Sequence, residues 1–300
     1  MMSMHIAVTG THGLLARHLV PALEAAGHHV TAVVRGDAGP GQVHWDPQAG
    51  VLDPAALTGI DAMIHLAGVG IFSRWTAERK RQLLDSRVKG TTLIARRLAD
   101  LDPRPAVLLS ASAIGFYGDR GGEILTEDSA GGEGFLADLC ARWEAATAAA
   151  QAAGIRTVHL RTGIVQAADG GALKAQLPLF KAGVGARLGN GAQWISWISV
   201  ADEIGAILHA LGAEDLSGPV NLTAPEAVTN ATYTKVLGRV LSRPTILAVP
   251  AVALRAVLGS EMATEMLLGG QRVAPAALGR SGYRFAHPEL FGALCATLGR

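Results

Sequence analysis

The sequence contains few cysteines and no excess of charge of either sign. Only two of its 300 residues are cysteines, Cys140 and Cys295. Two cysteines cannot build a disulfide framework, and their spacing is not that of metal ligands, so we expect no metal site and two reduced, buried thiols. Lysine and arginine number 26 against 25 aspartates and glutamates. This balance argues against nucleic acid or an anionic membrane surface as the main partner.

Long apolar runs are also absent. No uncharged apolar segment approaches the roughly 20 residues that a membrane-spanning helix needs. The N-terminus runs straight into a predicted strand, with no basic region ahead of an apolar signal core. These absences predict a soluble, cytoplasmic protein that does not insert into membranes. No feature of the sequence indicates its oligomeric state.

The N-terminal segment follows the pattern strand, glycine turn, helix. Residues 5–8 form an apolar run typical of a buried strand, and apolar residues recur at helical spacing from Leu14 onward. Between them, Gly10 would let the chain turn sharply, Gly13 would let the backbone approach a pyrophosphate, and Ala16 would let the helix pack on the sheet. The pattern predicts a dinucleotide site at the helix N-terminus, although a glycine-rich turn without a ligand is the alternative. The predicted contacts are Gly10, Thr11, His12, Gly13, Leu14 and Leu15.

Arg35 directly follows the second predicted strand, residues 29–34. In a dinucleotide-binding fold this position faces the adenine ribose, where an arginine accommodates a 2′-phosphate and an acid would accept from the 2′-hydroxyl. Arg35 therefore favours NADP(H), while Asp37 two residues later leaves NAD open. A solvated loop arginine is the alternative without a cofactor role.

Two further predicted strands end in small or polar residues. Segment 61–68 passes from an apolar strand into a turn of small residues, and segment 106–112 ends in serine hydroxyls. Since the carboxyl ends of parallel strands meet at one edge of a sheet, both would line the same crevice as the glycine turn. Two side chains of the basic helical stretch that follows residue 74, Gln82 and Arg87, are expected near this crevice. The cofactor contacts predicted here are Leu66, Ala67, Gly68, Gln82, Arg87, Ser110 and Val165.

Together these motifs resemble an extended short-chain dehydrogenase/reductase of the nucleotide-sugar epimerase type. The TGxxGxxA opening, the Leu-Ala-Gly strand end and the Ser-Ala-Ser strand end before Tyr117-Gly118 carry this resemblance. Other motifs are similar to atypical "epimerase family" proteins, which have a C-terminal domain of unknown function and are sometimes labelled cell-division inhibitors. They are Ser86-Arg87-Val88, Phe135-Leu136-Ala137 with Trp143-Glu144, Arg161-Thr162-Gly163-Ile164-Val165, Gly189-Asn190-Gly191, Trp194-Ile195-Ser196-Trp197, Asn221-Leu222-Thr223-Ala224-Pro225 and Gly270-Gln271-Arg272-Val273 with Pro275.

The resemblance implies an α/β fold: a Rossmann-type doubly wound parallel sheet that binds NADP(H), with a small mixed α/β C-terminal lobe closing a substrate cleft. The nucleotide-binding domain is placed at residues 1–218, including a substrate-loop segment at 166–198, and the lobe at 219–300. The glycine-rich stretch 170–191 is expected to be a mobile loop, and 282–285 a short strand. Helices are predicted over 14–26, 75–84, 87–99, 136–153, 203–211, 229–241, 251–258, 262–268 and 287–298.

The sequence departs from the active pattern that this resemblance implies, a serine with a tyrosine acid/base and a lysine four residues later. Ser112 matches the serine. Counting back from Glu144, the tyrosine position falls on Leu136 and the lysine position on Cys140, and neither can do that chemistry. Tyr117 is the remaining catalytic candidate, although a structural role in its turn is the favoured alternative because no lysine accompanies it.

Two residues are candidates for contact with a substrate. Arg161, at another predicted strand end, would pair with a substrate carboxylate or phosphate, or with a loop acid such as Asp128. Trp194 and Trp197 face opposite sides of a predicted strand, so at most one lines the cleft, and Trp194 is the candidate.

The leading functional hypothesis is an NADP(H)-dependent oxidoreductase or epimerase-like enzyme acting on a small polar substrate, such as a nucleotide sugar or carbonyl compound. Ser112 would polarise a carbonyl or hydroxyl, and the cofactor would carry hydride. The alternative is a non-catalytic NADP(H)-binding sensor, as the missing tyrosine and lysine suggest.

Overall fold

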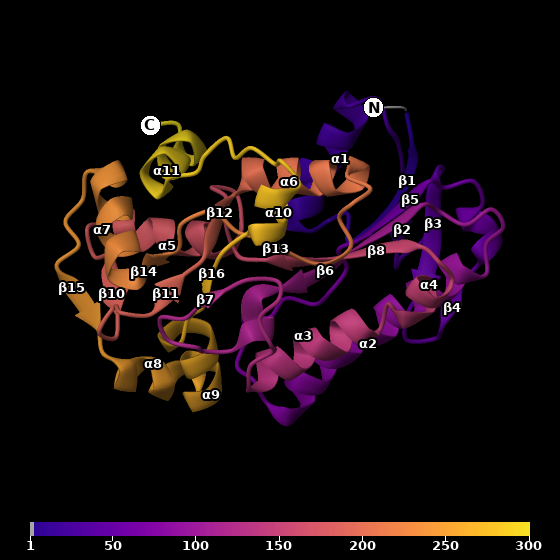
Figure 1. Ribbon diagram of the computed structural model, residues 1–300. Helices are drawn as coiled ribbons and strands as arrows, with labels where there is room; N and C mark the ends of the chain where they lie inside the picture. Colours follow the sequence, from indigo (N-terminus) through magenta and orange to yellow (C-terminus); the bar gives the residue numbers. More distant parts are fainter. Residues whose placement is uncertain (1–2) are drawn as a thin grey trace.

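The computed structural model describes residues 3–300 and is built around one eight-stranded sheet (Figure 1). Its strand order is β13-β8-β6-β5-β1-β2-β3-β4, and every neighbouring pair is parallel except β3 with β4. The predicted Rossmann-type doubly wound sheet is therefore confirmed. The strands are β1 (His5–Thr9), β2 (His29–Val34), β3 (Gln42–Asp46), β4 (Val51–Leu52), β5 (Ala62–His65), β6 (Val107–Ala113), β8 (Arg156–Thr162) and β13 (Gly218–Leu222).

Helices cover both faces of the sheet, which explains why its central strands are apolar along their whole length. Alternate residues enter two separate cores: Ile6 and Val8 pack with α1 and α6, while Ala7 packs with α2 and α4. Figure 1 shows α1, α6 and α10 above the sheet and α2, α3 and α4 below it. The helices are α1 (Leu14–Ala25), α2 (Ala77–Ala99), α3 (Phe135–Ala145), α4 (Ala148–Ala152), α6 (Val200–Gly212) and α10 (Ala276–Arg280).

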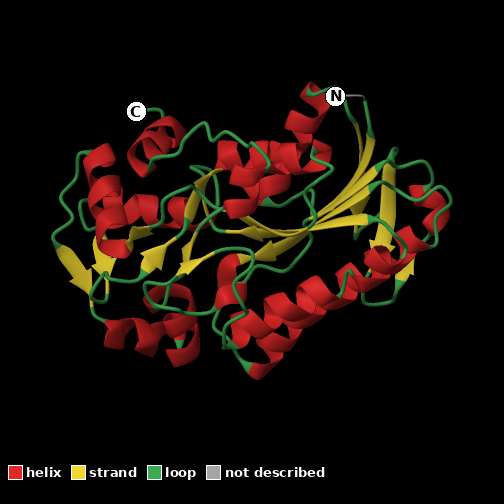
Figure 2. Cartoon of the chain, in the orientation of Figure 1, coloured by secondary structure: helices red, strands yellow, loops and turns green. Residues whose placement is uncertain are grey.

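A second lobe lies at the carboxyl side of the sheet, on the left in Figures 1 and 2. Its core packs Leu173, Phe180, Trp197, Leu237 and Leu294 together. Its helices are α5 (Gly171–Lys181), α7 (Asn230–Leu241), α8 (Ala251–Leu258), α9 (Ser260–Ala263), the π-helical turn η3 (Thr264–Leu268) and α11 (Leu290–Leu298). Its paired strands are β9 (Ile164–Gln166) with β12 (Trp197–Ser199), β11 (Trp194–Ile195) with β14 (Val228–Thr229), and β10 (Ala186–Leu188) with β15 (Leu247–Val249).

Short elements complete the chain. The pair β7 (Ile124–Leu125) and β16 (Arg272–Val273) joins the nucleotide-binding part to the C-terminal segment. Two 3₁₀ turns, η1 (Pro54–Leu57) and η2 (Ile114–Tyr117), follow β4 and β6. Within residues 3–300, no helix combines the length and the apolarity that crossing a membrane requires.

Two helix predictions are wrong in extent. The stretch predicted as helices over 75–84 and 87–99 is one continuous helix, α2, which begins after Thr76, whose hydroxyl accepts from the Arg79 N–H at 3.1 Å. The stretch predicted as one helix over 136–153 forms two helices, α3 and α4. Each of them is shorter than α2. The break lies at Thr147, whose buried hydroxyl donates to the Glu144 carbonyl and also meets His159 Nε2. This local hydrogen bond competes with helix continuation.

Predictions for the second lobe also need correction. Much of the expected mobile loop 170–191 is the helix α5, whose Leu173 and Phe180 are buried in the lobe core despite the flanking glycines. The stretch 282–285 forms no strand, because Tyr283 packs against α6 and its hydroxyl donates to the Asp202 carbonyl. Helix α6 is capped by Ser199, whose hydroxyl accepts from the N–H of Asp202 inside the helix.

Candidate functional site

The turn between β1 and α1 has the geometry of an anion cradle. Gly10 has a φ of +73°, and a Cβ built there would lie 2.9 Å from the Leu66 carbonyl carbon, so both conformation and space require glycine. The Gly13 N–H donates to the Gly10 carbonyl at 2.8 Å. Helix α1 begins at Leu14 with no side-chain cap and no acidic residue in its first turn. Its first N–H groups therefore suit a pyrophosphate.

The end of β5 lies against this cradle. Thr9 and His65 are register partners on β1 and β5. The Thr9 hydroxyl meets His65 Nδ1 at 2.8 Å and accepts from the N–H groups of Leu66 and Ala67 at 3.1 and 3.2 Å. Burial lowers the pKa of His65 to about 4, so the imidazole is neutral. The structure thus brings the predicted residues Leu66, Ala67 and Gly68 beside the glycine turn.

The other predicted cofactor residues occupy different surroundings. His12 and Arg35 are exposed at the adjacent carboxyl ends of β1 and β2, and Thr11 and Leu15 are half-buried. Gly170 and Gly171 pack on the Leu14 side chain, and the Val165 carbonyl oxygen lies 3.9 Å from a Cβ built on Gly171. Ser110 is fully buried. Gln82 is exposed on α2, where it accepts from Arg79 and donates to Glu78.

A polar network crosses three neighbouring strands at the same edge of the sheet. Ser112 on β6 is the register partner of Arg161 on β8, and Arg161 is the partner of Asn221 on β13. The Ser112 hydroxyl donates to Glu144 Oε1 at 2.7 Å. Arg161 donates from Nε and Nη2 to the two Glu144 carboxylate oxygens, both at 2.8 Å. This bidentate pair is the strong form of an arginine–carboxylate contact.

Tyr117 and Phe116 complete this network. The Tyr117 hydroxyl donates to Asn221 Oδ1 at 2.7 Å and accepts from Arg161 Nη1 at 2.9 Å. Its side chain is fully buried, and burial raises its pKa. The Arg161 guanidinium lies 3.6 Å from the centre of the Phe116 ring. The carboxylate paired with Arg161 is therefore Glu144 on α3, and Asp128 is not in this pair.

The two tryptophans near the second lobe differ in exposure. Trp197 is buried in the lobe core, and its indole N–H donates to the Glu226 carbonyl at 3.1 Å. Trp194 is half-buried, with the Arg272 guanidinium 4.4 Å from its ring centre. Of these two tryptophans, Trp194 is therefore the partly exposed one.

Sequence reasoning missed a contact that joins the second lobe to α3. The Glu265 carboxylate accepts from the N–H groups of Phe135 and Leu136, at 3.0 and 2.9 Å. It supplies the cap that α3 lacks locally, because Gly134 precedes that helix. A second bridge nearby joins Lys80 on α2 to Glu261 on α9. The missing cap before residue 135 was the one signal available in the sequence.

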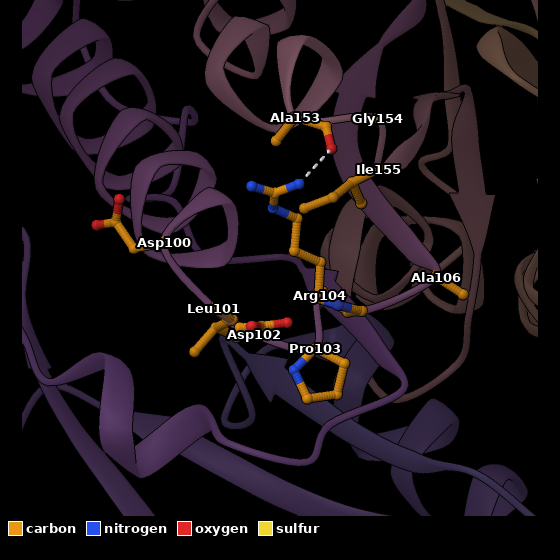
Figure 3. Close-up of a pocket in the computed structure, with 10 residues that line it drawn as sticks. Asp100, Leu101, Asp102, Pro103, Arg104, Ala106, Ala153, Gly154 and Ile155 are labelled. Atoms are coloured by element: carbon orange, nitrogen blue, oxygen red, sulfur yellow. Dashed lines mark hydrogen bonds between the residues drawn. The ribbon is translucent and has the colours of Figure 1, made fainter.

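A separate surface hollow of about 580 Å³ lies at the opposite, amino edge of the sheet (Figure 3). It is lined by residues 100–106 and 153–155, and Arg104 donates across it to the Ala153 carbonyl at 3.3 Å. Because the glycine turn and Ser112 are at the carboxyl edge, this hollow is not part of the candidate site. Among residues 3–300, no group of three or more histidine, cysteine, aspartate or glutamate side chains is arranged to hold a metal ion.

Comparison with known proteins agrees with this geometry. Residues 6–222 match the family described as "NAD dependent epimerase/dehydratase family", and residues 249–297 match a domain of unknown function, DUF1731. The chain belongs to the NAD-dependent epimerase/dehydratase family. An epimerase family protein of Mycobacterium bovis is 46% identical over 291 residues, which cover 96% of each chain. The resemblance inferred from the motifs is thereby confirmed.

Two solved structures of this epimerase/dehydratase fold are informative. The crystal structure of the human epimerase family protein SDR39U1 (isoform 2) contains NADPH, and superposes with a TM-score of 0.89 at 32% identity over 99% of both chains. The cofactor predicted from Arg35 and the glycine turn is the one this relative holds. MoeE5, solved with UDP-glucose and NAD, has a TM-score of 0.76 at 19% identity over 98% of this chain and 97% of its own, which shows the fold alone.

The positions at which the family resemblance implies a catalytic tyrosine and lysine hold Leu136 and Cys140. Both side chains take part in apolar packing. A Cβ built on Gly115 in η2 would lie 3.2 Å from Leu136 Cβ and 3.8 Å from Cys140 Sγ, so α3 presents both side chains to the end of β6. Burial raises the pKa of the Cys140 thiol to about 12. The Cys140 thiol stays protonated at neutral pH and is a core residue, as predicted, whereas Cys295, also expected to be buried, is only half-buried.

Replacing Gly13 by valine is expected to weaken NADPH binding at least roughly a hundredfold while the fold is kept. A Cβ at this position meets the Gly10 carbonyl oxygen at 3.0 Å and no other atom of the described chain within 4 Å, so a valine there would fill the space beside the N-terminus of α1. Calorimetric titration with NADPH measures the loss. Gly122→Val is the matched control, because a Cβ there has no neighbour within 4 Å in the described chain. Unchanged affinity in folded Gly13→Val would mean that the motif is only a turn.

Proposed function

We propose that this protein binds NADP(H) and transfers hydride to or from a small polar substrate, as an oxidoreductase or epimerase-like enzyme. The support for the cofactor is the uncapped N-terminus of α1 beside Gly10, together with the NADPH held by the human relative. Arg35, exposed beyond β2, would take the 2′-phosphate in a charge-assisted hydrogen bond. When bound, NADPH supplies hydride to an electrophilic carbon, and the neighbouring oxygen takes up a proton.

The observation that carries the catalytic proposal is the fixed position of Ser112. Its hydroxyl is oriented by Glu144, and Glu144 is itself held by two hydrogen bonds from Arg161. Because the hydrogen of Ser112 points to Glu144, its oxygen is left to accept from a substrate hydroxyl. Rotation of the same hydroxyl would let it donate to a substrate carbonyl, while Arg161 keeps the carboxylate paired. Ser112 would thus align the substrate oxygen in either direction of the reaction.

A specific observation also favours the second candidate, an NADP(H)-binding sensor without catalysis. The acid/base positions hold Leu136 and Cys140, and Tyr117 is fully buried with its hydroxyl held between Arg161 and Asn221. Positioned acid/base groups contribute roughly 10²–10⁴ in rate, so an enzyme lacking them would be slow. The two candidates therefore differ in whether any turnover depends on Ser112.

Single-turnover oxidation of bound NADPH separates these candidates. A panel of carbonyl compounds and nucleotide sugars is mixed with the NADPH complex, and absorbance of the reduced nicotinamide is followed. Ser112→Ala is expected to slow the reaction at least roughly tenfold with NADPH affinity unchanged, because the substrate oxygen loses its alignment. Ser260→Ala, at an exposed serine on α9, is the control and keeps the rate. Silence across the panel, with a protein partner whose binding requires NADPH, would favour the sensor.

A further inference from the structure

Arg272 is a half-buried cation whose hydrogen-bond donors are unused. It lies on β16, and its guanidinium is 4.4 Å from the ring centre of Trp194. Within residues 3–300, its side chain forms no hydrogen bond and no ion pair. An arginine that is held against an aromatic ring, with its fork of N–H donors free, suits the two oxygens of a carboxylate or a phosphate. The pair of Arg272 and Trp194 is therefore a candidate anion site.

The backbone on both sides of this arginine is bound to the chain that runs from β11 to β12. A Cβ added to Gly270 would collide with the carbonyl oxygen of Trp194, so this close approach requires glycine. The Ser196 hydroxyl donates to the Gln271 carbonyl at 2.7 Å and accepts from the Val273 N–H at 2.9 Å. The arginine lies between these two bonded residues. Because its backbone is already fixed, an anion can bind with little further ordering of the protein.

The same segment reaches the polar network at the carboxyl edge of the sheet. Val273 packs with Tyr117 in one small core. The carbonyl of the next residue, Ala274, accepts from Asn221 Nδ2 at 3.0 Å, and Asn221 accepts in turn from the Tyr117 hydroxyl. Figure 1 shows β16 between the large sheet and the second lobe. The arginine is thus placed on the second-lobe side of the network that orients the Ser112 hydroxyl.

Arg161, which the sequence offered as an anion-binding residue, is not free for this role. Its Nε and Nη2 donate to Glu144 and its Nη1 donates to the Tyr117 hydroxyl, so each guanidinium nitrogen already has an acceptor. A substrate anion at Arg161 would displace a buried bidentate partner, which is costly. Arg272, by contrast, can accept an anion without breaking any contact of the described chain.

We propose that Arg272, held against Trp194, binds an anionic group of the substrate, a carboxylate or a phosphate. This inference rests on the proposed function, because the anion is placed in the same molecule as the carbon that exchanges hydride with NADP(H). Hydride transfer leaves that anion unchanged, so Arg272 binds it equally before and after the reaction. Such uniform binding lowers KM without changing kcat. The substrates are thereby narrowed to acidic carbonyl compounds and the corresponding alcohols.

Calorimetric titrations of the NADPH complex with benzoate, phenyl phosphate and benzamide test the site without turnover, because NADPH reduces none of these probes. Bound NADPH also keeps the phosphate probe away from the turn at Gly10. Both anions are expected to bind roughly tenfold or more tightly than neutral benzamide. Arg272→Met removes this preference, and Arg272→Lys, which keeps the charge without the fork, retains part of it. Arg284→Met, at an exposed arginine of the same C-terminal segment, is the control. The anion that binds more tightly identifies the group as carboxylate or phosphate.

Turnover gives an independent readout. The aldehyde 4-carboxybenzaldehyde and its methyl ester carry the same reducible group and differ in the negative charge. Arg272→Met is expected to raise KM for the acid at least roughly tenfold, while kcat and the kinetics of the ester are kept.

A merely structural Arg272 would change these affinities differently. Equal losses for both anions and benzamide in Arg272→Met would overturn the inference, as would anions that bind the unaltered protein no more tightly than benzamide. Should Arg272→Met fail to fold, Arg272→Lys decides: a loss confined to the anions supports the inference, and an equal loss for benzamide overturns it. Anion binding that depends on Arg272 without any turnover would support the inference and count only against catalysis. An unaltered protein that does not bind NADPH would overturn the proposed function and the inference together.

Discussion

Arg161→Met is expected to lower the free energy of unfolding by about 3–5 kcal/mol. The substitution leaves the Glu144 carboxylate buried without its counter-charge, since the two side chains are only 4% and 11% exposed. It also removes the donor that Arg161 supplies to the Tyr117 hydroxyl. Urea unfolding followed by circular dichroism measures the change.

Two companion variants locate the cause of that loss. Adding Glu144→Gln to Arg161→Met removes the stranded charge, and part of the stability is expected to return. Arg142→Met breaks the pair with Asp138, whose side chains are 58% and 53% exposed, and is expected to cost about 0–1 kcal/mol. A loss for Arg161→Met as small as that of Arg142→Met would show that the network does not stabilise the fold.

Glu203→Gln is expected to stabilise the protein more at pH 8 than at pH 5, by a difference on the order of a few kcal/mol. Glu203 is fully buried on α6, with the Thr162 hydroxyl donating to Oε1 at 2.8 Å. Burial raises its pKa from 4.5 to about 8. Between pH 4.5 and about pH 8, the Glu203 carboxyl is ionised in the unfolded chain but protonated in the folded protein. The contribution of Glu203 to the free energy of unfolding is therefore fully present below pH 4.5 and is lost as the pH rises to about 8.

Glutamine removes this pH dependence because it is neutral throughout and keeps the oxygen that accepts from Thr162. Urea unfolding of both proteins at pH 5, 6.5 and 8 gives the difference at each pH, so contributions from other titrating groups cancel. Glu226→Gln, at an exposed position, serves as the control and should show no trend. A difference that stays constant from pH 5 to pH 8 would mean that Glu203 is already ionised in the folded protein.

Local patterns in the sequence predicted the parts of the site that depend on neighbouring residues. The turn of Gly10 and Gly13, the small residues after β5 and the apolar helix face around Cys140 are each encoded within a few positions. For such segments, backbone conformation and periodicity decide the structure. The positions of the missing tyrosine and lysine, Leu136 and Cys140, came instead from the family resemblance by counting back from Glu144, and the structure places both side chains at the end of β6.

The network around Arg161 could not be predicted in this way. Each strand end was expected at the same edge, but the pairing of Ser112, Arg161 and Asn221 depends on the register of three strands. Register is fixed by packing of the whole sheet and is not visible in any one strand. The Glu265 cap on α3 likewise joins residues far apart in the chain. Long-range contacts, more than local propensity, therefore complete the site.

The discontinuous core of the second lobe has a consequence for how the chain is made. Leu173, Leu177 and Phe180 on α5 pack with residues of α7 and with Leu294 on α11, near the C-terminus. A chain emerging from the ribosome presents its N-terminal segments first. The apolar side chains of α5 therefore stay unburied until their partners on α7 and α11 have been synthesised. During that interval the seven sheet strands that precede α5 in the chain are already synthesised while α5 stays uncovered. Chaperone binding and aggregation should therefore concentrate on this segment of the nascent protein.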